Sequence, residues 1–330
     1  MTALPDVTAP LSEAEAETAF GVLLDGAPSE ADIEAFLIAL SQRGETADEI
    51  AGAARALRAR LIPINAPDNA IDVCGTGGDG HHTLNVSTAV SLVVAACGVP
   101  VAKHGNRAAS SKAGAADTLE ALGLDLDAAG RTAEKTLAEI GICFLFARNH
   151  HPAMARIQPI RMKIGQRTIF NLMGPLSNPA KVTSQLIGIA RPAYVPIYAD
   201  ALAKLGTGRS LIVSGDEGLD ELSLAGGNEV AVVTNSAFTM ERVDASIAGL
   251  PYAPVEAIRG DDAWHNAAAL KALLMGAPGP YRDAVLLNAA GALLVAGRGA
   301  GWRDRVDIAA EALDSGRAQA LLGKWIALAK

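Results

Sequence analysis

The apolar residues near the start of the chain recur with the spacing of helices. The segment EADIEAFLIALSQR carries them in the i, i+3, i+4, i+7 order that forms one helix face. We expect one helix to end at Gly44, the next to end near Leu61, and no strand to lie between them. Residues 1–66 therefore predict a small all-helical domain. Three helix starts are marked by a hydroxyl residue three positions before an acidic residue: Ser12 with Glu15, Ser29 with Asp32, and Thr46 with Glu49.

From residue 67 onward, the pattern changes to short apolar runs bounded by glycine or polar residues. The runs that are typical of buried strands are AIDVC, VPVAK, ICFLFA, QLIGIA, SLIVSG and EVAVVT. Helical segments that end in glycine lie between several of them, and the chain becomes helical again from about Pro280. Such alternation is typical of a largely parallel sheet. We therefore predict an α/β protein whose second and larger domain, residues 67–330, is built on that sheet.

The composition limits which partners and which cellular location we expect for the protein. The 330 residues include 28 Lys and Arg against 36 Asp and Glu, a net charge of −8, and only 4% are aromatic. Such a chain repels a phosphate backbone and offers few rings to stack on bases, so we expect no nucleic-acid partner. Cys74, Cys97 and Cys143 lie in apolar stretches without CxxC spacing. With no signal-sequence pattern and no apolar run of about 18 residues, we expect a cytoplasmic protein and no membrane partner.

The loop after the first predicted strand has the sequence CGTGGDG, residues 74–80, and its glycines leave it with few side chains. Its GxGxxG spacing matches a dinucleotide fingerprint, but HHTLN separates it from the next helix, and the next strand ends at Lys103 instead of an acidic residue. A simple tight turn would not explain polar residues such as Asn85 and Ser87 at the start of that helix. Helix N-termini bind anions through their amides, and Lys103 and Arg107 add cations, so we predict an anion site.

The glycine loop and further motifs together resemble anthranilate phosphoribosyltransferase over essentially the whole chain. In order, the motifs are CGTGGDG, NVSTA, KHGNRAASSKAG, HPAMARIQPIRMKIGQRTIFNLMGPLSNP and GLDELS. Members of this family join the amine of anthranilate to C1 of 5-phosphoribosyl 1-diphosphate (PRPP), release diphosphate, and act in tryptophan biosynthesis. The resemblance implies a fold like that of nucleoside phosphorylases and phosphoribosyltransferases, with a helical insertion near residues 165–185. It also implies a homodimer formed through the helical part.

The resemblance further assigns residues to the two substrates. Because anthranilate already carries a free amine, we assign no acid or base, and we expect Lys103 and Arg107 to act electrostatically. Ala115 stands where the family often has a serine, so one hydroxyl that faces phosphate is missing, at a cost of about 1 kcal/mol. The residues expected to bind PRPP are Gly75, Gly77, Gly78, Asp79, Thr83, Asn85, Val86, Ser87, Thr88, Lys103, Asn106, Arg107, Ser110, Ser111 and Ala115. Those expected to bind anthranilate are Gly75, His104, Asn106, His151, Arg161 and Pro175.

Acidic residues after the strand SLIVS are candidates for holding a Mg²⁺ cofactor, which prefers oxygen ligands. Spacing does not distinguish the pair at 216–217 from the pair at 220–221, and a solvated acidic turn has the same composition. Asp79 would repel bare diphosphate, so we expect it to face ribose hydroxyls or backbone amides, or to contact the ligand through Mg²⁺. For the metal, the resemblance selects Asp220 and Glu221 and adds Ser87.

Other functions fit parts of the sequence less well. A nucleoside phosphorylase of related fold would also use a glycine loop and a lysine, but it would bind free phosphate and a nucleobase, which leaves Arg161 unexplained. A non-catalytic relative that binds nucleic acid would need a basic groove. Zinc would require a spacing such as HExxH, whereas His81–His82 and His150–His151 are adjacent pairs whose side chains diverge.

Overall fold

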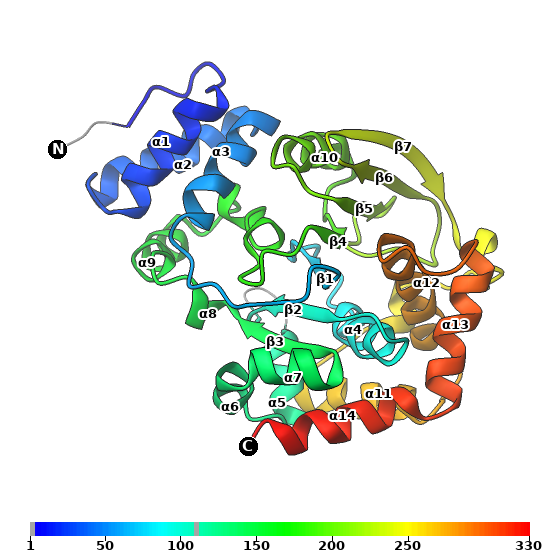
Figure 1. The fold of residues 1–330 in the computed structure, drawn as a ribbon. Helices are drawn as coiled ribbons and strands as arrows, with labels where there is room; N and C mark the ends of the chain where they lie inside the picture. Colours follow the sequence, from blue (N-terminus) through cyan, green and yellow to red (C-terminus); the bar gives the residue numbers. More distant parts are fainter. Residues whose placement is uncertain (1–3, 109–111) are drawn as a thin grey trace.

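The computed structural model describes residues 4–108 and 112–330. Figure 1 shows the N-terminal helices at one end of the molecule and a sheet running through its middle. The chain folds into α/β architecture with a helical group at its N-terminus, as the sequence predicts. The N-terminal helices are α1 (Glu13–Leu24), α2 (Glu30–Arg43) and α3 (Ala47–Arg58).

The predicted capping residues start all three helices. The side chains of Ser12, Ser29 and Thr46 each accept a hydrogen bond from the backbone N–H three residues further along. Gly44 ends α2 with a φ of 92°, as predicted. Helix α3 ends earlier than expected, at Arg58, and the Arg60 side chain satisfies the Ala56 carbonyl in its last turn at 2.8 Å.

A seven-stranded sheet forms the centre, with the strand order β3-β2-β1-β4-β5-β6-β7. Its strands are β1 (Ile71–Gly75), β2 (Val101–Gly105), β3 (Ile142–Phe146), β4 (Ser184–Gly188), β5 (Arg209–Gly215), β6 (Asn228–Thr234) and β7 (Ala237–Val243). The first five strands in this order, from β3 through β2, β1 and β4 to β5, run parallel to one another. Strand β6 pairs antiparallel with β5, and β7 pairs antiparallel with β6. The predicted strands and the largely parallel sheet are confirmed. The pattern missed β7, because this edge strand exposes most of its residues and so lacks a buried face.

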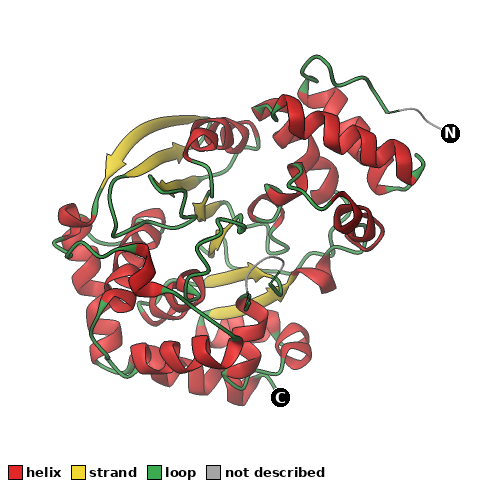
Figure 2. Ribbon diagram, turned by 180° about the vertical axis from the view of Figure 1, so that it is seen from behind, coloured by secondary structure: helices red, strands yellow, loops and turns green. Residues whose placement is uncertain are grey.

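Helices cover both faces of the sheet (Figure 2). They are α4 (Val86–Ala96), α5 (Ala115–Ala121), α6 (Leu126–Arg131), α7 (Ala133–Ile140), α8 (Ala147–His150), α9 (Met154–Ile164), α10 (Val195–Lys204), α11 (Ala263–Leu274), α12 (Pro280–Val295), α13 (Trp302–Asp314) and α14 (Arg317–Leu328). Short 3-10 turns are η1 (Ile169–Asn171), η2 (Pro175–Ser177), η3 (Pro192–Tyr194), η4 (Ala245–Ala248) and η5 (Val255–Ile258). Because successive strand residues point to opposite faces, Val73 of β1 packs with α4 and α12, whereas Cys74 packs in the core shared by α1–α3 and α10.

The helical insertion expected near residues 165–185 lies earlier in the chain. The helix that packs on α1 and α2 is α9, and residues 165–185 instead hold η1, η2 and the start of β4. Gly165, with a φ of 67°, ends α9, and the prolines at 175 and 179 disfavour a further α-helix. Phe170 still packs in the core of α1–α3, so this segment contacts the helical group. None of the helices in the described ranges has the length and apolar character that a membrane span requires.

Candidate functional site

The carboxyl ends of the central strands meet at a cavity of about 230 Å³, which we call the glycine-loop hollow. It lies where β1 and β2 end, at the edge of the sheet where parallel α/β folds bind ligands. Most of the predicted PRPP and metal residues are therefore brought together. The residues that line it are Cys74, Gly75, Gly77, Gly78, Asp79, Gly80, His82, Thr83, Leu84, Asn85, Val86, Ser87, Lys103, His104, Gly105, Asn106, Ala113, Gly114, Ala115, Asp220 and Glu221.

Glycines bring the loop and strand β4 into contact with Asp220. The Gly77 N–H donates to Asp220 Oδ2 at 2.6 Å. A Cβ at Gly75 would lie 2.3 Å from the same oxygen, and a Cβ at Gly188 would lie 1.5 Å from the Asp220 carbonyl oxygen. These glycines thus make room for an acidic segment of the chain as well as for a ligand. Sequence reasoning attributed the loop glycines to the ligand alone.

Burial raises the pKa of both Asp220 and Glu221. Repulsion adds to this effect, from Asp79 on Asp220 and from Asp220 on Glu221, while Lys103 opposes it at Glu221. A divalent cation between these oxygens would relieve the repulsion, so the residues fit Mg²⁺. Within residues 4–108 and 112–330, no group of three or more His, Cys, Asp or Glu side chains could hold a metal alone. Ligand oxygens and water would complete the coordination of Mg²⁺ here.

Lys103 is a buried cation in this hollow, with 2% of its surface exposed. Its Nζ donates to the Val73 carbonyl at 2.9 Å and to Ser87 Oγ at 3.2 Å. Burial lowers its pKa, and the neighbouring Asp72 partly restores it. Because an ammonium has three N–H donors, one remains for a ligand. The backbone N–H of Ser87, in the first turn of α4, is hydrogen-bonded to Glu221.

Two of the predicted phosphate ligands have other roles: Asn85 lines the hollow but its side chain bonds within the protein, and Thr88 does not line the hollow. The Asn85 carbonyl oxygen Oδ1 accepts from Thr118 Oγ1 at 2.5 Å and from Asn266 Nδ2 at 2.9 Å, so this side chain joins α4 to α5 and α11. Thr88 is buried away from the hollow, and its Oγ1 has no partner among the described residues. The first turn of α4 has no acidic residue and no side-chain cap, but the Val86 N–H donates to the Leu84 carbonyl at 2.7 Å and the Ser87 N–H to Glu221, so an anion here would meet the Thr88 N–H.

The structure places Arg107 outside the hollow. Its exposed guanidinium pairs with Glu120 at 2.5 Å and with Asp117 at 2.7 Å, and these hydrogen bonds raise its pKa. Ala115, by contrast, lines the hollow at the first residue of α5. Two further predicted phosphate ligands, Ser110 and Ser111, lie outside the described residues.

A second cavity, of about 430 Å³, adjoins the first, and we call it the α9 hollow. Arg161 lines it, with its guanidinium carbon 5.8 Å from the centre of the Phe170 ring. Burial lowers the pKa of Arg161, and no described carboxylate lies within 4.0 Å, so the guanidinium can receive an anionic ligand. The residues that line it are Leu57, His104, Asn106, Ala147, Arg148, His151, Met154, Ala155, Gln158, Arg161, Phe170, Met173, Gly174 and Ser177. Pro175 is not among them and lines another cavity.

A buried histidine pair lies where the two hollows adjoin: His104 lines both, and His151 lines the α9 hollow. His104 Nε2 and His151 Nε2 lie 3.2 Å apart, and His104 Nδ1 lies 3.1 Å from the Gly174 carbonyl oxygen. That carbonyl only accepts, so His104 carries its proton on Nδ1 and accepts at Nε2 from His151. Burial lowers the pKa of His104 to about 3 and that of His151 to about 4. Both imidazoles are therefore neutral at pH 7.

These histidines should make the fold sensitive to acid. In the unfolded chain their pKa is about 6.5, so the unfolded state binds more protons between pH 6.5 and 4, and the free energy of unfolding falls as pH falls. We expect a loss of about 2 kcal/mol per histidine between pH 7 and pH 5. Urea unfolding of the wild type and of His104→Gln with His151→Gln checks this. The double variant should lose less stability over that interval, and an equal loss would contradict the assignment.

Arg167 is a candidate that sequence reasoning missed. Its Nη1 donates to the Gly78 carbonyl at 2.8 Å and to the Gly77 carbonyl at 3.2 Å. It follows α9 and so ties the helical group to the glycine loop. Burial lowers its pKa, while Asp220 and Asp79 attract its charge. The residue lies within a motif of the family resemblance, but no local pattern indicates which loop its side chain reaches.

Comparisons with known proteins show similarity over both parts of the chain. Residues 8–61 match the model "Glycosyl transferase family, helical bundle domain", and residues 67–319 match "Glycosyl transferase family, a/b domain". The anthranilate phosphoribosyltransferase of Erythrobacter litoralis is 72% identical over 329 residues, which cover 100% of both chains.

Solved structures agree with this similarity. The anthranilate phosphoribosyltransferase of Thermus thermophilus superposes with a TM-score of 0.90 at 41% identity, covering 98% of this chain and 97% of that one. The Saccharomyces cerevisiae enzyme, solved in complex with PRPP and Mg, gives 0.87 at 29% identity and covers 97% and 93%.

Proposed function

The chain belongs to the anthranilate phosphoribosyltransferase family, and on this premise we propose which of its residues carry the reaction. The enzyme transfers the phosphoribosyl group of PRPP to the amine of anthranilate in tryptophan biosynthesis, releases diphosphate, and uses Mg²⁺. One observation supports this residue assignment more strongly than any other. The glycine-loop hollow and the α9 hollow share His104 and Asn106, so two ligands bound in them would meet.

PRPP, in this proposal, occupies the glycine-loop hollow. Its phosphate oxygens are received by those amides of the loop and of the first turn of α4 that are not already bonded within the protein, as the Gly77 and Ser87 amides are, since free N–H groups there form an anion site. Lys103 uses its remaining N–H donor on the ligand and places a fixed positive charge beneath the departing diphosphate. Arg107 lies outside this hollow, where its Nη1 is held by Glu120 and Asp117, so we assign it no direct contact with PRPP.

Asp220, Glu221 and Ser87 are the proposed Mg²⁺ ligands. When bound, Mg²⁺ supplies positive charge that stabilises the diphosphate as it leaves. The chain's own contribution is to hold the two carboxylates in place. Gly75 and Gly188 permit the close approach of Asp220, and the Ser87 N–H and Lys103 stabilise the charge of Glu221.

Anthranilate is proposed to lie in the α9 hollow, with its carboxylate on Arg161 and its amine toward Asn106. The aromatic amine is already a free nucleophile, so the reaction needs its alignment with C1 of PRPP more than a base. His104 and His151, both neutral, form part of the wall between the two ligands and receive no proton-transfer role.

An anthranilate fluorescence assay tests the proposed function. Purified protein should consume anthranilate only when PRPP and Mg²⁺ are both present, and EDTA should stop the loss of fluorescence. Unchanged fluorescence with folded protein would contradict the proposal. Phosphorolysis of thymidine or uridine by the same protein would favour the nucleoside phosphorylase alternative.

Arg167→Met should weaken PRPP binding. The substitution frees the carbonyls of Gly77 and Gly78 and removes a cation beside Asp79 and Asp220. We expect the KM for PRPP to rise about tenfold or more, since a charged hydrogen bond contributes about 1.5–3 kcal/mol, with the KM for anthranilate little changed. Lys163→Met is the matched control, because Lys163 lies on nearby α9 and pairs with Glu34 at the surface. Equal effects of the two variants would contradict this role.

We further propose two domains: a helical domain of residues 1–66, which also includes α9 and the residues after it up to about 185, and an α/β domain made of the rest of residues 67–330. A homodimer through the helical part and a cytoplasmic location complete the proposal. The exposed Met162 on α9 supports a partner surface there, and three unpaired cysteines support a reducing compartment. Light scattering of the wild type and of Met162→Asp tests the dimer, which the charge should weaken.

A further inference from the structure

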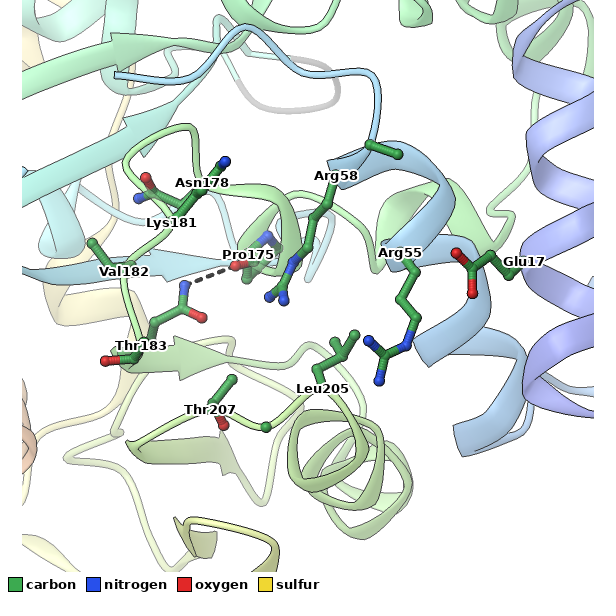
Figure 3. Close-up of a pocket in the computed structure, with 13 residues that line it drawn as sticks. Glu17, Arg55, Arg58, Pro175, Asn178, Lys181, Val182, Thr183, Leu205 and Thr207 are labelled. Carbon is green, nitrogen blue, oxygen red and sulfur yellow. Dashed lines mark hydrogen bonds between the residues drawn. The ribbon is translucent and has the colours of Figure 1, made fainter. Parts of the chain in front are cut away.

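We propose that a cavity at the opposite edge of the sheet binds a small organic anion, one carboxylate or phosphate group on an apolar body. This cavity of about 390 Å³ lies between the end of α3, the chain leading into β4 and the end of α10, and we call it the α3–β4 pocket (Figure 3). Pockets for small ligands commonly measure about 300–1,000 Å³. Its size therefore suits such a molecule.

Arg58 supplies a positive charge that the protein leaves uncompensated. Its Nε donates to the Leu176 carbonyl at 2.5 Å, and this is its one hydrogen bond among the described residues. No described carboxylate lies within 4.0 Å of it, and burial lowers its pKa. In a chain with a net charge of −8, a half-buried guanidinium without an acidic partner is unusual. Burying an unpaired charge costs free energy, and an anionic ligand would offset that cost.

Arg55 adds a second cation on the same face of α3. Figure 3 shows the guanidinium groups of Arg55 and Arg58 both directed into the space above Leu205. Arg55 already pairs with Glu13 at 2.5 Å and donates to the Lys204 carbonyl at 2.8 Å. Glu17 and Lys181 also line the pocket and carry opposite charges. With Glu13 offsetting Arg55, the net charge around the cavity is about one positive unit, which matches a single anionic group better than a diphosphate.

The rest of the lining indicates the body of the ligand. Pro175, Val182 and Leu205 provide apolar surface in the pocket, and Thr183 and Thr207 add hydroxyls. A guanidinium head site beside an apolar wall recognises a molecule with an anion at one end and a hydrocarbon or aromatic group at the other.

The pocket is separate from the site of the reaction. It lies where β4 and β5 begin, with Thr183 just before β4 and Thr207 just before β5. The glycine-loop hollow lies at the other ends of the parallel strands. No residue lines both cavities.

Calorimetric titration with benzoate and with phenyl phosphate tests the proposal. The background is Arg161→Ala saturated with PRPP and Mg²⁺, so that neither the α9 hollow nor the glycine-loop hollow contributes. We expect one probe to bind per chain, with a Kd weakened about tenfold or more by Arg58→Gln, because a charge-assisted hydrogen bond is lost. Leu205→Trp should abolish binding by filling the cavity while leaving every charge in place. The control is Arg60→Gln, whose guanidinium pairs with Asp25 outside the pocket and should not matter.

The two probes distinguish the source of the anion. Binding of benzoate alone identifies a carboxylate site, and binding of phenyl phosphate alone identifies a phosphate site. Either supports the proposal if Leu205→Trp removes it. The proposal is overturned if neither probe binds the folded protein. That result would also follow if a second copy of the chain fills the pocket. Binding that Arg58→Gln and Leu205→Trp leave unchanged also overturns the proposal.

Discussion

Replacing Asp220 by Asn together with Glu221 by Gln should lower kcat/KM for PRPP by about a thousandfold. This corresponds to about 4 kcal/mol, the scale of the charge stabilisation that a catalytic metal supplies. Both side chains keep their shape, so the Gly77 N–H retains an oxygen acceptor at residue 220. Steady-state kinetics over a range of Mg²⁺ concentrations measure the effect, and added Mg²⁺ should not restore the rate.

The same variant should be no less stable than the wild type. Burial and repulsion raise the pKa of both carboxyls, so their ionisation at pH 7 costs folding free energy, which neutral amides do not. Asp216→Asn with Glu217→Gln is the matched control. Asp216 forms an exposed ion pair with Arg242 at 2.6 Å, and we expect little change in either rate or stability. Equal kinetic effects of the two pairs would contradict the metal assignment.

Arg161→Ala should raise the KM for anthranilate about 10- to 100-fold, because a charge-assisted hydrogen bond is worth about 1.5–3 kcal/mol. The KM for PRPP should change little, since Arg161 lines the α9 hollow and not the glycine-loop hollow. Initial rates with each substrate varied in turn separate the two constants.

Arg156→Ala provides the control on the same helix. Its guanidinium packs against Gly26 of the N-terminal helical group and does not line the α9 hollow. We expect no change in either KM. If Arg161→Ala instead raised the KM for PRPP alone, anthranilate would have to bind elsewhere.

Much of the fold could be predicted because its signals are local. A cap such as Ser12 with Glu15 acts within one helical turn, and a buried strand such as ICFLFA is apolar throughout. Strand β7 could not be found in this way, since its pairing partner β6, and not its own pattern, holds it in the sheet. Of the segment expected near 165–185, the α-helical part lies earlier as α9, which Gly165 ends, and residues 165–185 hold 3-10 turns instead.

The site was predictable where a motif carries its own chemistry. The glycine loop, Lys103 and the start of α4 lie together as expected. The roles set by distant partners were not predictable. Gly75 makes room for Asp220, which lies far away in the sequence. The Asn85 side chain bonds to Asn266 across the domain, and Arg107 is paired with Glu120 and Asp117. Each of these depends on tertiary contacts that no short stretch encodes.

The most direct test is a crystal structure of the protein soaked with PRPP and Mn²⁺, whose anomalous signal marks the metal position. We predict diphosphate density against the glycine loop and the first turn of α4, with the Mn²⁺ peak beside Asp220 and Glu221. PRPP bound elsewhere in the molecule, with the glycine-loop hollow free of ligand, would contradict the account.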